Sequence, residues 1–443
     1  MDMLNGKIRT IYFQYLFAAL GSALIVSIYS LVDMVAVGQY EGPLGSAAMA
    51  CLQPMFTLFI ALGLLFGIGG SVMMSIARGR GDEDKGNRFF TVATVAALVV
   101  SVIITLLFVL FREHFLILFG ADAELLPYCM DYTFWLTMAV PFFLMAQVLS
   151  AFLRNDGAPF LATMATILGG GFNIFGDIFF VFTCDMGIGG AGLATFLGQV
   201  ISTTILLIHF FRKKNTLRFM RPANLMGDLK GVFSAGFAPF IVDISLGVTV
   251  AIFNNQIIRL SDSDHLAVYG VISNCIVLFQ SMFYGIGQSI QPIVSVNHGA
   301  GKGERVRQVL GLAMGTALVM GLIFCGALEL FPGGVLRLFM DVTDSVMSIG
   351  PAILRVYALS FLLMGFNIVG SYYFQSILKN GQSLLISLLR GFILCAAFVL
   401  AFPALFGFYA IWWAMPVTEL GTLCVTLVLL TRSGALKKEK LPG

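Results

Sequence analysis

Residues 66–71 read FGIGGS, and residues 284–289 read YGIGQS. The second copy lies 218 residues after the first, and a glycine in the charged turn that follows each copy, Gly81 and Gly301, recurs at an offset of 220 residues. Similar stretches at a nearly constant offset indicate that one large block has been duplicated. We therefore expect two halves of similar fold.

The composition is that of a membrane protein. Apolar residues make up 58% of the chain and charged residues 11%, and the mean hydropathy is +0.93. Soluble proteins carry roughly a quarter charged residues, so a water-soluble globule is excluded. Runs long enough to span a bilayer, at about 20 residues each, predict an all-α polytopic protein with twelve transmembrane helices near 8–39, 45–77, 88–112, 125–152, 159–183, 188–211, 228–259, 264–298, 305–328, 346–377, 382–403 and 406–431.

Basic residues predict the orientation. They gather in the loops on one side and in the connector 212–230, which holds six of them, whereas the other side has only Arg112, Arg259 and Arg337. By the positive-inside rule both termini are expected to be cytoplasmic. The net charge of +3 thus reflects topology and contact with membrane lipids, and no nucleic-acid partner is expected.

The even helix count predicts two pseudo-symmetric six-helix lobes that insert the same way up. The lobes are residues 1–211 and 231–443, joined by the connector 212–230. Such repeats are typical of secondary transporters, which build a central site between like halves. The seven cysteines and four histidines show no metal-binding spacing, so we expect no cofactor and no enzymatic metal site. The first apolar run is long enough to span and has no cleavage site, so no signal peptide is expected.

Four polar side chains share one predicted layer of the N-terminal lobe. Asp33 and Asp177 each lie about 9 Å below the outer end of their helices, with Asn173 and Thr195 at about 15 and 10 Å. Their repeat equivalents, where we could align them, are alanines: Ala251 for Asp33, Ala401 for Asp177 and Ala414 for Thr195. The polar groups are thus present in only one of the two similar halves, as a functional site would require. Helix-to-helix hydrogen bonding is the alternative.

The chemistry of this set suits a small cation. An ionised aspartate at a helix centre costs about 2.5–3.5 kcal/mol, so each needs a partner, a proton or a water-lined cavity. Two carboxylates in a low-dielectric pocket do not both ionise cheaply, so one of them is expected to hold a proton. Carboxylate, amide and hydroxyl oxygens also form a cage for Na⁺. The predicted coupling ion is H⁺, Na⁺ or both in competition.

Other intramembrane charges are assigned more simply. Glu419 and Arg390 lie at similar depths, which predicts a buried ion pair. Asp131 is expected to cap a helix near the outer surface. Asp243 stands near the middle of the predicted helix 228–259, four residues after Pro239. It would either attract cationic substrates or make a local hydrogen bond.

These residues resemble the multidrug and toxic compound extrusion (MATE) transporters, especially their bacterial branch. The matches are YSLVD at 29–33 with Val37-Gly38, Asn173-x-x-x-Asp177, Thr195, and QPIVSVNHGA at 291–300, which is the most specific. The resemblance covers essentially the whole chain and implies a location in the plasma (inner) membrane of a bacterium. Some members carry an acidic pair in the C-terminal lobe. That pair is not evident here, where the predicted helix 346–377 has Asn367 instead.

The resemblance implies a V-shaped antiporter, working as a monomer, that exports small amphiphilic, often cationic compounds in exchange for H⁺ or Na⁺. It implies cation binding by the residues that match the family's site, Asp33, Asn173, Asp177 and Thr195. Candidate substrate-binding residues are Asp243, Asn367 and Gln291. The alternatives are a lipid-linked oligosaccharide flippase of the same superfamily and an intramembrane enzyme. The first would need a cationic cavity, and the second a Gly-x-Gly-Asp motif or a metal set that the sequence lacks.

Overall fold

The chain is built from helices that cross the membrane. The structure, a computed structural model, describes residues 3–261, 263–339 and 342–434. All regular elements among these residues are helical, and twelve helical spans are long and apolar enough to cross a bilayer. The prediction of an all-α protein with twelve membrane spans is confirmed.

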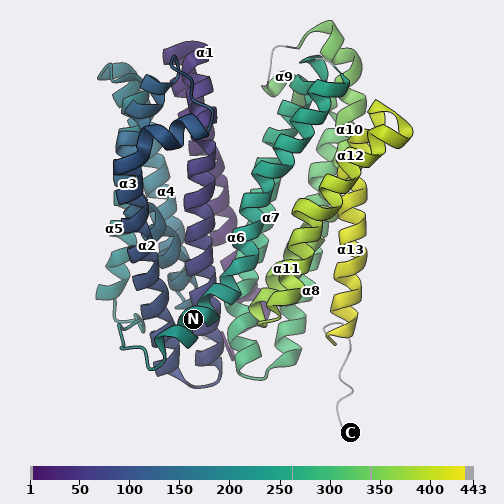
Figure 1. Ribbon diagram of the computed structural model, residues 1–443. Coiled ribbons are helices and arrows are strands. Elements are labelled where there is room, and N and C mark those ends of the chain that lie inside the picture. The colour runs from purple at the N-terminus through teal and green to yellow at the C-terminus, as the bar shows by residue number, and fades with distance from the viewer. Residues whose placement is uncertain (1–2, 262, 340–341, 435–443) are drawn as a thin grey trace. The chain divides into compact units, whose positions relative to one another are not determined.

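The first six spans come from the first half of the chain (Figure 1). Their elements are α1 (Ile8–Gly79), α2 (Glu83–Leu118), α3 (Leu126–Asn155), α4 (Pro159–Gly176), the π-helix η1 (Asp177–Thr183), α5 (Gly187–Leu207) and the 3₁₀-helix η2 (Ile208–Phe211). The long α1 contains two spans because Gly42 breaks it with a φ of 67° and a ψ of −146°. Only glycine adopts this conformation at little cost, so its position fixes the turn between the first two spans.

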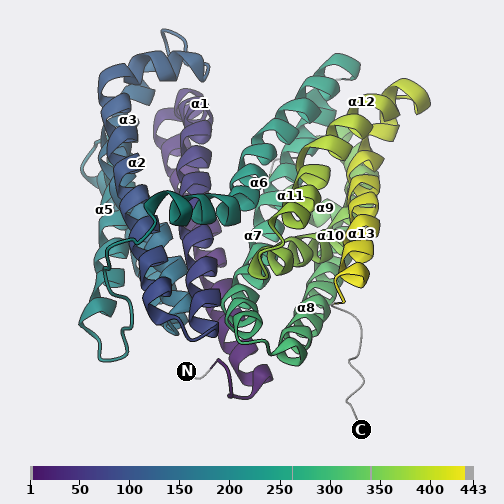
Figure 2. The ribbon, with the colours of Figure 1, turned by 60° about the horizontal axis from the view of Figure 1, so that its bottom comes forward.

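The remaining spans come from the second half of the chain. Their elements are α6 (Leu225–Leu260), α7 (Ser263–Gly299), α8 (Gly303–Leu330), α9 (Pro332–Phe339), α10 (Asp344–Ser376), α11 (Asn380–Leu388), the π-helix η3 (Leu389–Ile393), α12 (Leu394–Phe406), the 3₁₀-helix η4 (Phe408–Trp413) and α13 (Ala414–Arg432). In this half α10 packs against α7, α8 and α13. Figure 2 shows α7 and α8 joined by a short turn.

The described chain forms two compact units. One contains Phe17–Phe240, and the other contains Leu4–Leu16 together with the chain from Ile241 onward. The lobe boundaries around 212–230 stay a prediction. They were defined by the sequence repeat, whereas these two units are defined by contacts between residues. Residues 435–443 of the predicted C-terminal lobe lie outside the described residues.

The start of the chain is fastened to the second unit by hydrogen bonds. Lys302 Nζ donates to the carbonyl oxygen of Leu4 at 2.9 Å, and Arg305 Nη2 donates to that of Gly6 at 2.8 Å. These contacts explain why the first turns of α1 belong to the second unit although most of that helix belongs to the first.

The connector after η2 is fastened to the first unit by Asp156. Its carboxylate accepts hydrogen bonds from Arg78 Nη1 at 2.6 Å and from the backbone nitrogen of Thr216 at 3.1 Å, and it is hydrogen-bonded to His209 Nε2 at 2.7 Å. Burial raises the pKa of Asp156, but the hydrogen bonds from His209 and Thr216 and the charge of Arg78 lower it more, to a net value below the usual 3.8. The ionised carboxylate of Asp156 therefore adds to the free energy of unfolding at pH values above the usual pKa. This contribution is lost as the pH falls through the lowered pKa.

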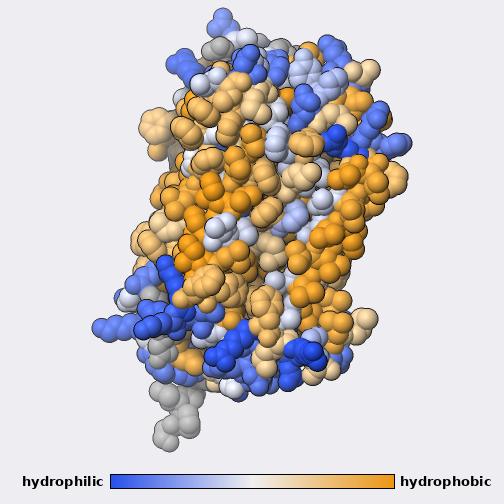
Figure 3. Space-filling model, turned by 90° about the vertical axis from the view of Figure 1, so that its left-hand side faces the viewer, coloured by the Kyte–Doolittle hydropathy of each residue, from blue (hydrophilic) through white to orange (hydrophobic). Residues whose placement is uncertain are grey.

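The outer surface of the bundle suits a lipid environment. The face drawn in Figure 3 carries a broad hydrophobic band with hydrophilic residues at both ends. On α2, for example, Leu98, Val102, Leu106 and Leu110 are all exposed. In water such a surface would be unfavourable, whereas lipid tails solvate it, which explains why few α2 side chains are buried.

Glycines allow α6 to approach α1 within the first unit. A Cβ atom on Gly236 would lie 1.9 Å from the carbonyl oxygen of Leu65, and one on Gly69 would lie 2.2 Å from that of Val232. Both clashes are with backbone atoms, which cannot move aside as a side chain can. The two helices therefore pack at a distance that only glycine permits.

We predict that Gly236→Ala destabilises the protein by about 1–3 kcal/mol, because the added methyl group forces the two backbones apart. The melting temperature of the purified protein in detergent measures the effect. Gly247→Ala is the matched control on the same helix, because nothing lies within 4 Å of its added Cβ atom. Equal melting temperatures for both variants would contradict the close contact.

Candidate cation site and the ion-pair cluster

The four predicted cation-site residues come from four elements of the first unit. Asp33 lies on α1, Asn173 on α4, Asp177 at the start of η1 and Thr195 on α5. Their exposed fractions are 6%, 3%, 0% and 5%. All four are therefore removed from water, and each polar atom needs a partner within the protein or a bound ion.

A tyrosine links three of the helices at this point. Tyr132 Oη on α3 donates to Asp33 Oδ2 at 2.8 Å and lies 3.0 Å from Thr195 Oγ1. Asn173 Nδ2 donates to Thr195 Oγ1 at 3.2 Å. Asp33, Tyr132, Thr195 and Asn173 thus form one hydrogen-bonded chain. Asp177 lies four residues after Asn173, one helical turn further along the same span.

Four oxygen atoms of this group have no hydrogen-bond partner among the described residues. They are Asp33 Oδ1, Asn173 Oδ1 and both carboxylate oxygens of Asp177. All four are buried acceptors. Buried carboxylate oxygens without donors are costly, so the group is incomplete without a proton, a cation or water.

Close packing of two helices explains how Asn173 and Thr195 meet. A Cβ atom on Gly198 of α5 would lie 2.8 Å from the carbonyl oxygen of Gly169 on α4, and one on Gly176 would lie 2.8 Å from the Cβ atom of Ala194. The small residues let α4 and α5 approach closely. The helix then widens into η1 at Asp177, and π-helical turns of this kind are frequent at functional sites.

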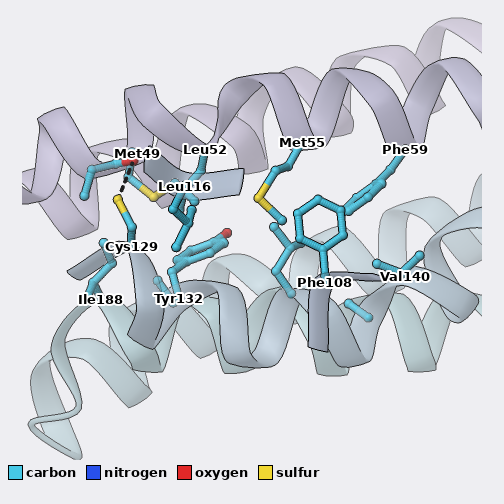
Figure 4. Close-up of a cluster of buried hydrophobic side chains, with 14 of the residues drawn as sticks. Met49, Leu52, Met55, Phe59, Phe108, Leu116, Cys129, Tyr132, Val140 and Ile188 are labelled. Carbon is cyan, nitrogen blue, oxygen red and sulfur yellow. Dashed lines mark hydrogen bonds between the residues drawn. The ribbon is translucent and has the colours of Figure 1, made fainter. Parts of the chain in front are cut away.

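Tyr132 is the member of the site that sequence reasoning missed. Its ring packs in a cluster of buried apolar side chains that includes Met49, Leu52 and Ile188 (Figure 4). The ring is therefore fixed by packing, and only the hydroxyl takes part in the polar chain. Its position offered a signal, because Tyr132 lies six residues into the fourth span, which is about 9 Å along a helix and so in the predicted polar layer.

Two expectations for this region need correction. Asp33 lies nine residues before Gly42, about 13 Å along the helix rather than 9 Å, because the first span continues beyond residue 39. Asp131 does not cap α3: it is exposed and sits within the helix, whereas Asp122 Oδ1 accepts from the backbone nitrogens of Glu124 and Leu125 just before the helix begins.

The predicted pair of Glu419 and Arg390 is present in the second unit. Arg390 Nε, on η3, donates to Glu419 Oε1 of α13 at 2.6 Å, and Asn367 Nδ2 on α10 donates to Glu419 Oε2 at 2.7 Å. Arg390 Nη2 donates to Gln280 Oε1 at 2.9 Å, and Gln280 Nε2 donates to Tyr284 Oη at 2.6 Å. We call these five residues the ion-pair cluster.

The three candidate substrate-binding residues lie on elements of the second unit. Asn367 belongs to the ion-pair cluster. Gln291 is buried on α7, seven residues after Tyr284 and so about 10 Å further along the helix. Asp243 is 9% exposed, and its Oδ2 atom has no hydrogen-bond partner among the described residues. The side chain of Ala251, the repeat equivalent of Asp33, lies outside the described residues.

Comparison with known proteins supports the fold and the family. A family model described as MatE matches residues 18–179 and 239–405, one segment in each half. The multidrug export protein MepA of Staphylococcus saprophyticus is 24% identical over 417 residues, covering 93% of this chain and 90% of that protein.

Solved structures agree over nearly the full length. An outward-facing multidrug resistance MATE family transporter of the MOP superfamily is 20% identical, with a TM-score of 0.91 and coverage of 99% of this chain and 98% of that one. A MOP superfamily transporter from Pyrococcus furiosus has the same identity, TM-score and coverage, and its binding pocket is described as having reverse polarity that suggests a different function.

The family model fits both halves, as the duplicated FGIGGS motif predicts, and the two matched segments cover well over half of the chain. The twelve spans and the agreement with solved structures fit the same assignment. This chain belongs to the MatE family and is a bacterial membrane transporter.

Proposed function

We propose that this transporter is an antiporter that exports small amphiphilic, often cationic compounds in exchange for H⁺ or Na⁺. The names of its relatives support the substrate class, because the MepA proteins are multidrug exporters. The observation that carries the coupling is the set of buried acceptors without partners at Asp33, Asn173 and Asp177. A proton or a monovalent cation would satisfy them.

The geometry suggests how the ion is held. A proton on either aspartate would remove one of two neighbouring buried charges, and Na⁺ would draw the free oxygens together. The hydroxyls of Tyr132 and Thr195 would orient Asp33 and Asn173 around it. Because both ions would neutralise the same carboxylates, H⁺ and Na⁺ should compete for this site.

Efflux from proteoliposomes tests the proposal. Protein reconstituted with a fluorescent monovalent organic cation should export it when a Na⁺ or a H⁺ gradient is imposed alone. The ion that drives export is the coupling ion. Export that is independent of both gradients would contradict the antiport mechanism.

We predict that Tyr132→Phe weakens ion-coupled efflux without unfolding the protein. The ring would keep its packing, but Asp33 would lose a hydrogen bond worth about 2 kcal/mol, equivalent to roughly thirtyfold in apparent ion affinity. The concentration of Na⁺ or H⁺ that gives half-maximal efflux measures the change. Tyr357→Phe is a matched control, because Tyr357 is a buried tyrosine in the second unit. An unchanged half-maximal concentration would argue against the role of Tyr132.

Asp243 is proposed to favour cationic substrates. We predict that Asp243→Asn weakens export of monovalent cations by roughly tenfold, about 1.4 kcal/mol, while neutral substrates are spared. Asp344→Asn, an exposed acid at the start of α10, is the control. Competition assays with a cationic and a neutral substrate measure the difference. Equal loss for both would assign Asp243 a structural role.

The flippase alternative finds less support in the structure. A lipid-linked oligosaccharide carries phosphates, which require a cationic cavity. Arg390 is instead held against Glu419 at 2.6 Å, and Arg355 is more than half exposed, with its Nε atom on the carbonyl oxygen of Glu329. Both termini in the cytoplasm, contact with membrane lipids and a monomeric state remain part of the proposal. Accessibility of single cysteines introduced near each terminus tests the orientation.

A further inference from the structure

The two halves of the chain differ in whether the carboxylate oxygens of these buried acids have hydrogen-bond partners. In the N-terminal half, the carboxylates of Asp33 and Asp177 have three oxygens without partners among the described residues. In the C-terminal half, both carboxylate oxygens of Glu419 are hydrogen-bonded, one to Arg390 and the other to Asn367. The group of Asp33 and Asp177 therefore has oxygens available for a cation, whereas Glu419 is already paired with one. Asp243, a buried acid of the C-terminal half outside this pair, also has one oxygen without a partner among the described residues.

The two groups stand on corresponding helices. Asp177 lies on the fifth span and Thr195 on the sixth, whereas Arg390 lies on the eleventh span and Glu419 on the twelfth. The two π-helical segments of the described chain also fall on this pair of spans. Asp177 is the first residue of η1, and Arg390 is the second residue of η3. Each half thus carries an ionisable side chain at a widened turn of the corresponding helix, although the two positions are not equivalent in the repeat, because Asp177 aligns near Ala401.

The guanidinium is well placed to act as a fixed cation. Arg390 is 8% exposed and Glu419 is 0% exposed, so the pair is screened little by water. Gln280 and Tyr284 extend the hydrogen bonds on the guanidinium side, and Thr426 Oγ1 donates to Asn367 Oδ1 at 3.0 Å on the carboxylate side. Each polar neighbour is thereby oriented toward the pair.

We propose that Arg390 is the resident cation of the C-terminal half, filling opposite Glu419 the place that an exchangeable cation takes opposite Asp33 and Asp177. Ion exchange would then be confined to the N-terminal half. It also follows that removing the guanidinium creates a second exchangeable site, at Glu419, for a proton or a monovalent cation. This inference rests on the proposed coupling role of the N-terminal site.

Cation counting on the purified full chain tests this inference. Binding of radiolabelled Na⁺ and proton uptake after a downward pH jump are measured on the same detergent-solubilised samples. Arg390→Gln should take up one more cation per chain than the wild type. Adding Glu419→Gln to that variant should remove the extra cation, and Arg390→Lys should leave the count unchanged because it keeps the charge. No extra cation in folded Arg390→Gln, or an extra cation that persists in the double variant, would overturn the inference.

Two further variants keep the test decisive. If Arg390→Gln does not fold, the double variant Arg390→Gln/Glu419→Gln, which removes both charges of the pair, must still show the wild-type count. A lower cation count would show that Arg390 and Glu419 take part in binding the exchangeable cation, which would contradict the inference. Adding Asp177→Asn to Arg390→Gln separates the two claims. It should lose the cation of the first site and retain the new one, so a failure of the proposed function would not be mistaken for a failure of this inference.

Discussion

Replacing Asp33 or Asp177 by asparagine is expected to reduce gradient-driven efflux to the level of protein-free vesicles. Either change removes one of the two carboxylates that a cation would neutralise, while the near-identical shape of asparagine preserves packing. Each carboxylate is buried and has at least one oxygen without a hydrogen-bond partner among the described residues, where an ion could bind. Uptake of the fluorescent cation into inverted vesicles under an imposed ion gradient measures the loss.

Asp131→Asn provides the control for these variants. Asp131 lies on α3 next to Tyr132, but its side chain is exposed and takes no part in the hydrogen-bonded chain. It should transport like the wild type. Melting temperatures close to that of the wild type would show that the Asp33 and Asp177 variants are folded. Normal ion-coupled efflux by both would refute the assignment of the site.

The second large effect is expected on stability. Glu419→Ala should destabilise the protein by about 3–5 kcal/mol, because it leaves the Arg390 guanidinium buried without a counter-charge. Asn367 would also lose an acceptor for its side-chain nitrogen. Thermal unfolding in detergent, together with the amount of protein recovered from the membrane, measures the effect.

A double-mutant cycle gives the control for this prediction. Changing Arg390 to glutamine as well should recover much of the stability, since the uncompensated charge is then gone. The coupling free energy between the two positions should be large. A Glu419→Ala variant that melts at the wild-type temperature would show that the pair contributes little.

The sequence alone predicted the membrane architecture well. Apolar runs report the lipid-embedded part of each helix, so the spans were found but some of their ends were not. The third span was expected at 88–112, whereas α2 runs over Glu83–Leu118. Its charged first turn is still helical because Asp82 caps it, accepting from the backbone nitrogen of Lys85 at 2.9 Å. A search for apolar residues passes over such polar ends.

The polar residues were predicted less completely than the helices. Depth along a helix can be counted from the sequence, which grouped Asp33 with Asp177 and Glu419 with Arg390. The direction in which a side chain points depends on helix rotation and on π-helical turns, which no residue pattern specified. For that reason Tyr132 was missed although it lies in the predicted layer, and the hydrogen bond from Asn367 to Glu419 was not predicted.

The most direct test of the central claim is whether a substrate gradient moves the coupling ion through the site of Asp33 and Asp177. Because an antiporter exchanges substrate for ion, a substrate gradient must drive the ion in the opposite direction. Proteoliposomes are loaded with substrate at equal Na⁺ and H⁺ on both sides, and ion flux is recorded after dilution. The wild type and Asp131→Asn should show ion uptake that follows substrate release, and Asp177→Asn should show none. Equal substrate-driven ion flux in Asp177→Asn and the wild type would contradict the account.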